Sequence, residues 1–91
     1  MKVTIIPSDG CVYIDGESID GLDLSFIDAS VHAVQWNGTS GEVEIKDPQT
    51  GKLVRNDAID SIAPYQAAID AWRAVKEATP VQPEASGVQT L

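Results

Sequence analysis

Over the first 55 residues, apolar and polar side chains alternate in short runs that are separated by turn-forming residues. A period of two residues is typical of strands that bury one face, and β-branched residues favour such strands. The runs with this character are 2–6, 11–14, 31–36, 42–46 and 52–55. The pattern therefore predicts a small antiparallel sheet in the first part of the chain.

Glycine-containing turns separate these predicted strands. Asn37-Gly38 is the strongest short hairpin signal, because both residues tolerate the positive φ of a tight reversal. The tripeptide Ile-Asp-Gly occurs at 14–16 and again at 19–21, which we interpret as successive turns of a meander. Residues 21–27 are apolar without regular alternation, so they are either a further strand or an irregular segment that packs on the sheet.

After residue 60 the apolar spacing changes to steps of three and four residues, which indicates one face of an amphipathic helix. Pro64 suits the first helical turn, and Ser61 or Asp60 is placed to cap it. Thr79-Pro80 is expected to end the helix. The apolar stripe consists of Ile62, Tyr65, Ile69, Trp72 and Val75 or the stem of Lys76.

These elements predict an α+β fold: an antiparallel β-meander of three to five strands with one C-terminal amphipathic helix packed on it. We expect a single small domain over residues 1–78. Residues 79–91 are rich in Pro, Ser, Gly and Gln and show no periodicity, so we interpret them as a flexible C-terminal tail.

The charge of the chain is strongly acidic, with 14 acidic and six basic residues and a formal net charge of −8. Phosphate backbones are bound mainly through Lys and Arg, so direct binding of nucleic acid is disfavoured. Two interpretations of the acidity remain: a solvated surface, or mimicry of nucleic acid towards a basic groove. We expect no membrane partner, because no run of about 18 apolar residues occurs.

The residues that could carry catalysis or hold a metal ion are few. The chain has one cysteine, Cys11, and one histidine, His32, both in predicted strands, and we expect no enzyme activity and no cofactor. Structural zinc takes four Cys or His ligands, so no metal site is expected. Four aspartates in turn-rich sequence lack the spacing of a calcium loop and are better explained by Asx turns. They are Asp15, Asp20, Asp23 and Asp28.

The two tryptophans are the remaining candidates. Trp72 lies on the helical stripe, where packing on the sheet is the expected role. Trp36 ends a predicted strand beside the hairpin turn, so it is either a core residue or an aromatic anchor for a partner. A sheet with one helix has one covered face, which leaves the other face, or a free edge strand, for a partner.

The stretch DGCVYIDGESIDGLDLSFIDASVHAVQWNGTSGEVE resembles small acidic proteins encoded in the tail regions of bacteriophages and prophages. The resemblance rests on the turn Asp15-Gly16, the segment 21–25, the strand 31–36 and, more loosely, the helix around Trp72. It covers about residues 9–45. The resemblance implies a tail-fibre accessory or assembly protein, and it supplies no catalytic residues.

Together these observations predict a non-enzymatic phage or prophage protein that binds another protein during virion assembly, such as a tail or fibre protein or a second copy of itself. The candidate contact residues are Trp36, His32, Asn37 and Gly38. The alternative is an acidic phage-encoded inhibitor that occupies a basic groove of a host nucleic-acid-binding or defence protein. The short apolar start and the single cysteine favour the host bacterial cytoplasm as its location, with the virion as a further location.

Overall fold

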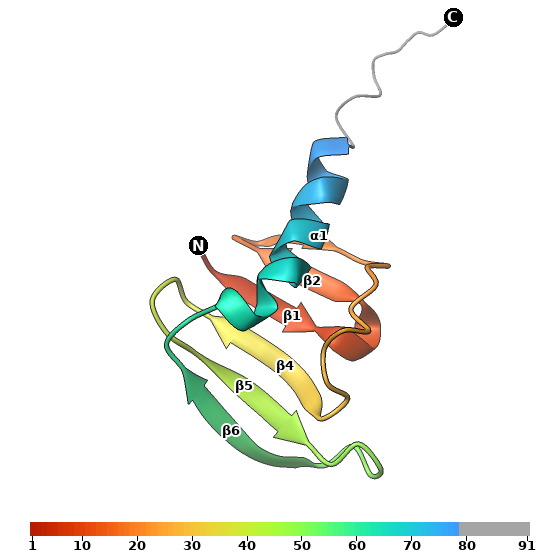
Figure 1. Ribbon diagram of the computed structural model, residues 1–91, viewed down its shortest axis with the longest axis vertical. Helices are drawn as coiled ribbons and strands as arrows, with labels where there is room; N and C mark the ends of the chain where they lie inside the picture. Colours follow the sequence, from red (N-terminus) through yellow and green to blue (C-terminus); the bar gives the residue numbers. More distant parts are fainter. Residues whose placement is uncertain (79–91) are drawn as a thin grey trace, which may run out of the picture.

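The computed structural model describes residues 1–78, which form one six-stranded antiparallel sheet with a helix across one face (Figure 1). The predicted tail, 79–91, lies outside the described residues. The strands are β1 (Val3–Ile6), β2 (Cys11–Ile14), β3 (Glu17–Ile19), β4 (Val31–Trp36), β5 (Gly41–Lys46) and β6 (Leu53–Ile59); a 3₁₀ turn (Ala63–Tyr65) leads into helix α1 (Gln66–Ala78).

The strand order in the sheet is β3-β2-β1-β4-β5-β6, and every neighbouring pair is antiparallel. The first strand in sequence therefore lies inside the sheet, hydrogen-bonded to both β2 and β4. Residues 20–30 connect the edge strand β3 to β4 on the far side of β1. They form no strand or helix, but the side chains of Leu24 and Ile27 are buried in the core.

The core lies between the sheet and α1. Alternate strand positions contribute buried apolar side chains, and the helix adds three of its own, because its residues at steps of three and four share one face. The central members are fully buried: Val3, Ile5, Val12, Val34, Ala68 and Ile69 are at most 1% exposed. The expected role of the helical stripe is confirmed for Ile69 and Trp72, and Ile62 and Tyr65 pack against the core, but Val75 is exposed.

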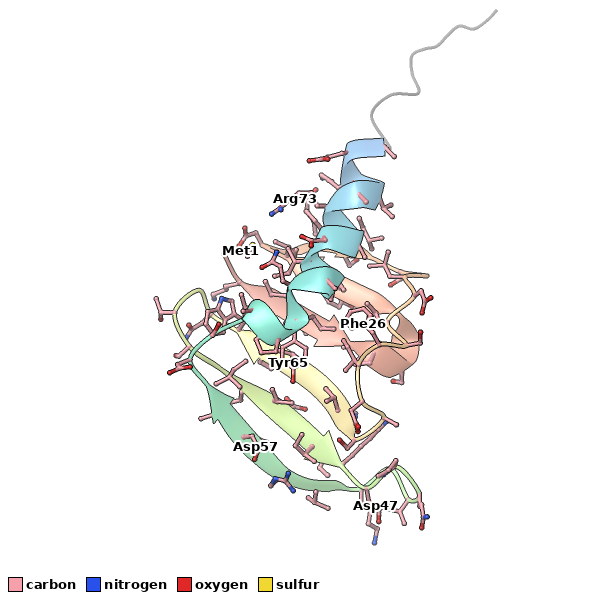
Figure 2. The ribbon with its side chains drawn as sticks, viewed as in Figure 1. Met1, Phe26, Asp47, Asp57, Tyr65 and Arg73 are labelled. Carbon is pink, nitrogen blue, oxygen red and sulfur yellow. The ribbon has the colours of Figure 1, made fainter. Side chains whose placement is uncertain are left out.

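The helix covers the sheet unevenly. Its side chains pack mainly on β2 and β3, and its C-terminal turns extend past the end of the sheet, whereas β5 and β6 lie away from it (Figure 1). Tyr65, just before the helix, projects towards the middle of the sheet (Figure 2). Within residues 1–78, no helix or strand packs on the opposite face of the sheet, which we call the open face.

The α+β class and the C-terminal helix are confirmed, but the sheet has six strands, one more than the predicted maximum. The additional strand is β3, which lies between the two Ile-Asp-Gly turns. The segment 21–27 is irregular, one of the two alternatives. The last strand, β6, continues to Ile59 rather than ending at residue 55.

Candidate interaction surface

The structure places Trp36 in the hydrophobic core, where its side chain is 9% exposed. It lies directly opposite Val3 on β1 and therefore shares the helix-covered face of the sheet. Of the two roles considered for Trp36, a core residue or an anchor for a partner, the structure supports the core residue. Its burial argues against its choice as a main contact residue, because a side chain that is 9% exposed presents little surface to a partner.

The other three candidate residues are not gathered at one place. Asn37 and Gly38 are exposed at the β4–β5 hairpin, whereas half-buried His32 lies near the opposite end of β4. Asn37 is five positions after His32 along the strand, which is about 16 Å at about 3.3 Å per residue. His32 also occupies a register shift in the β4–β5 pairing, so it belongs to a bulge rather than to the hairpin tip.

The hairpin itself is held by the side chain of Asn37. Its Oδ1 atom accepts hydrogen bonds from the backbone N–H groups of Thr39 and Ser40, at 3.0 and 2.9 Å. The Asn37 N–H donates to the Ser40 carbonyl at 2.9 Å, which closes the ladder, and Gly38 takes a φ of 107° at the tip. The hairpin was predicted correctly, but its two central residues are Gly38 and Thr39 rather than Asn37 and Gly38.

Cys11 and His32 do not form a nucleophilic pair in this fold. Strand β1 lies between their strands, which places the two backbones about 10 Å apart. Burial raises the pKa of the Cys11 thiol, and the neighbouring carboxylate of Asp20 acts in the same direction. An activated cysteine needs the opposite shift, towards the thiolate.

The acidic turns have a structural explanation. The Asp23 carboxylate accepts hydrogen bonds from the Ser25 hydroxyl at 2.6 Å and its N–H at 3.1 Å, and Asp28 accepts one from the Ser30 N–H at 2.8 Å. These Asx turns lower the pKa of both carboxyl groups. Over residues 1–78 no three Cys, His, Asp or Glu side chains are grouped so that they could hold a metal ion.

The open face carries a row of side chains that crosses the whole sheet. Residues directly opposite each other in paired strands point to the same face, and the members of this row pair in succession. Glu42 is the only charged member. From β3 to β6 the row is Ser18, Tyr13, Thr4, Gln35, Glu42 and Ala58.

Hydrogen bonds between side chains stiffen this row. The Thr4 hydroxyl donates to Oε1 of Gln35 at 2.8 Å, and Nδ2 of Asn56 donates to Oε1 of Glu42 at 3.1 Å. Tyr13 stands beside Thr4 with 41% of its surface exposed. The open face is therefore a preordered polar surface with an exposed aromatic side chain.

A shallow hollow of about 720 Å³ lies at the hairpin end of this row. Its lining includes Thr4, Gln35 and Glu42 of the row, together with Asn37 and Ser40 of the hairpin. The exposed hairpin predicted from the sequence thus borders the open face. The row itself was not anticipated, because the order of the strands decides which residues become neighbours across the sheet.

Comparison of this chain with protein-family models, with curated proteins and with solved structures finds no match. None of the helices within residues 1–78 is long and apolar enough to cross a membrane.

Proposed function

We propose that this chain is a non-enzymatic protein-binding module whose open face, together with the 37–40 hairpin, contacts a partner during the assembly of a bacteriophage tail or tail fibre. The observation that carries this proposal is the row across the open face. Thr4 and Gln35 of the row are joined by a hydrogen bond and Glu42 accepts one from Asn56, yet every member of the row except half-buried Thr4 is exposed.

The chemistry of the row suits a polar protein contact. Tyrosine contributes a large, rigid and amphipathic surface, and it is enriched among the residues that dominate binding energy. Tyr13 is exposed in the row, and Gln35 offers both a donor and an acceptor. Five of the six residues in the row are uncharged, so most of its contacts should depend less on salt than contacts made by carboxylates.

The phage setting is supported by the sequence resemblance of residues 9–45 to acidic proteins of phage tail regions. The acidic inhibitor is a second candidate, and the net charge of −8 favours it. The two proposals differ in which part of the surface is used. An inhibitor of a basic groove would use the carboxylates, and its complex would dissociate as salt screens them.

The experiment is a pull-down of tagged protein from lysates of phage-producing cells at low and high salt, with mass spectrometry of the retained proteins. The test variant is Tyr13→Ala with Gln35→Ala. The control is Arg73→Ala, because Arg73 is exposed on α1 away from the sheet (Figure 2). We expect a tail or fibre protein to survive high salt with wild type and control.

For the double variant we expect at least about a tenfold loss of affinity for that purified partner, as for residues that dominate an interface. Equal binding of the double variant would contradict the use of the open face. Recovery of a host nucleic-acid-binding protein that elutes with salt would contradict the assembly role and support the inhibitor.

A further inference from the structure

Within residues 1–78, strand β6 is a free edge of the sheet and the longer of its two edges. It has seven residues, against three in β3, and it pairs with β5 on one side only (Figure 1). An edge strand leaves one row of backbone N–H and C=O groups without a partner in the sheet, and such a row is a template for another strand. Leu53 and Val54 are also 56% and 58% exposed.

The pairing of the inner strands shows which backbone groups face outwards. The Lys46 N–H donates to the Ser30 carbonyl on the β4 side, at 2.8 Å, and the Asp47 N–H donates to Lys52 on the β6 side, at 2.9 Å. The backbone N–H and C=O groups of successive strand residues point to opposite neighbours. The backbone groups of the odd-numbered residues of β5 therefore face β6.

In β6 the residues that face β5 are therefore those opposite Ile45 and Val43, namely Arg55 and Asp57. The backbone groups of Asn56 and Ala58 face outwards. A register shift between the Lys46–Leu53 and Ile45–Arg55 pairs makes Val54 the additional residue of a bulge, so the regular part of the edge begins at Arg55.

The charges on this edge are complementary to those of a second copy of the same edge. Arg55 and Asp57 flank Asn56, and their side chains lie on the same face of the sheet, joined by an ion pair at 2.9 Å. Both remain largely exposed, at 62% and 47% of their side chains. If a second β6 approaches antiparallel with Asn56 opposite Asn56, each Arg55 lies opposite an Asp57 of the other copy.

The hydrogen-bond alternation and the charges select the same register. The backbone hydrogen bonds between the two strands form only when outward-facing residues lie opposite each other. The allowed registers therefore differ by steps of two residues. One step either way places Arg55 opposite Arg55 or Asp57 opposite Asp57. Like charges directly opposite each other are destabilising, and opposite charges are stabilising.

We propose that β6 pairs with β6 of a second copy of this chain, antiparallel and centred on Asn56. In this dimer the two Asn56 residues exchange backbone hydrogen bonds, and two Arg55–Asp57 pairs cross the interface. Residues opposite each other share a face, so the two sheets become one and the two open faces lie side by side.

The test compares single and mixed charge-reversal variants of the full chain by sedimentation velocity over a concentration series. R55D alone and D57R alone each place like charges opposite each other at two positions, which should weaken the dimer about thirtyfold. An equimolar mixture of the two variants restores both cross-copy pairs, so the mixture should dimerise as wild type does.

The mixture separates pairing between copies from the ion pair within one copy, because each variant lacks its internal Arg55–Asp57 pair whether or not it is mixed. A second variant, N56P, removes an outward N–H group, and an edge strand tolerates proline at such a position. N56P should remain folded by circular dichroism and sediment as a monomer.

A wild-type chain that remains monomeric at the highest soluble concentration overturns the proposal. So does a dimer that is unaffected by R55D, D57R and N56P, since its interface must then lie elsewhere. Loss of association in both single variants without recovery in the mixture also overturns it. None of these outcomes bears on the binding of a partner to the open face, which is measured separately.

Discussion

Trp72 joins the helix to the edge of the sheet in two ways. Its indole Nε1–H donates to the backbone carbonyl of Glu17 on β3, at 3.0 Å, and its ring is 9% exposed in the core. Lys76, one helical turn later, lies 5.9 Å from the centre of the ring and forms an ion pair with the Glu17 side chain. One residue of a short edge strand thus receives two contacts from α1.

We expect Trp72→Phe to lower the free energy of unfolding by about 1–3 kcal/mol, because it leaves the Glu17 carbonyl without its donor and removes buried ring volume. Urea denaturation followed by circular dichroism measures the change. Trp36→Phe is the matched control for lost ring volume on the same core. An equal or smaller loss for Trp72→Phe than for Trp36→Phe would show that the hydrogen bond contributes nothing.

Gly41 marks a close approach between β5 and β4. A Cβ atom at this position would lie 2.1 Å from the Gln35 carbonyl oxygen. Gly51 provides the contrast, since a Cβ atom there meets nothing within 4 Å although its φ is 77°.

We expect Gly51→Ala to destabilise the fold by about 1–2 kcal/mol through its backbone conformation alone. Gly41→Ala should cost more, about 2–4 kcal/mol, because backbone atoms must move apart. Thermal and urea unfolding of both variants checks the order. A reversed order would mean that the β4–β5 pair can shift at little cost.

At the scale of single residues, the sequence predicts local roles better than roles that depend on distant neighbours. The sequence favours a core role for Trp36 but leaves an interface role open, and the pairing with Val3 assigns its ring to the covered face. Asn37 is the opposite case: its turn chemistry acts within a few residues, so its place at a hairpin was predictable.

Among the elements, those with a strong local signal were predictable, whereas the edge strand β3 and the second half of the edge strand β6 were not. Strand β3 has only three residues between two turns, too few to show alternation. The end of β6 contains Asn56 and Asp57, which are poor strand formers, and it is held by pairing with β5 rather than by propensity. Edge strands depend on a neighbour that the local sequence does not reveal.

The start of the helical segment gives a prediction at this scale. The Ser61 hydroxyl accepts a hydrogen bond from the Ala63 N–H at 3.1 Å, where the 3₁₀ turn begins. The N-cap residue itself is Ile62, so Ser61 does not cap the turn as the sequence suggested. Ser61→Ala should cost about 0.5–1.5 kcal/mol, the range for one lost hydrogen bond. Urea denaturation measures it, and Ser61→Thr, which keeps the hydroxyl, should recover most of the loss. A variant as stable as wild type would show that this hydrogen bond does not stabilise the fold.

For the whole molecule, the excess of acidic groups is a source of self-repulsion in the compact state. We expect the melting temperature to rise by about 2–4 °C between about 0.01 and 0.15 M NaCl. This range corresponds to relief of about 0.5 kcal/mol in a domain of this size, as the screening length shrinks from about 30 to 8 Å. A fall over the same range would mean that attractive ion pairs outweigh the repulsion.

Asp23 and Asp28 should contribute to the loss of folding stability as the pH falls. Both pKa values are lowered in the folded state by hydrogen bonds from Ser25 and Ser30, so their contribution is present above about pH 4 and is lost as the pH falls through the lowered values. Asn keeps the acceptor oxygen but does not titrate. We expect the double variant D23N/D28N to lose less stability than wild type between pH 5 and pH 3, in urea midpoints. An identical loss would contradict this.

The interior position of β1 has a consequence for how the chain acquires its structure. Val3 must find Trp36, and Trp72 must find Glu17, 55 positions away, so completion of the core depends on contacts distant in sequence. Chains rich in such contacts fold slowly, on a scale of milliseconds to seconds. During synthesis β1 leaves the ribosome before the other strands and α1 leaves after all of them, so until then the apolar face of the sheet is exposed. The partly synthesised chain is therefore prone to aggregate through this exposed apolar face until α1 packs on it.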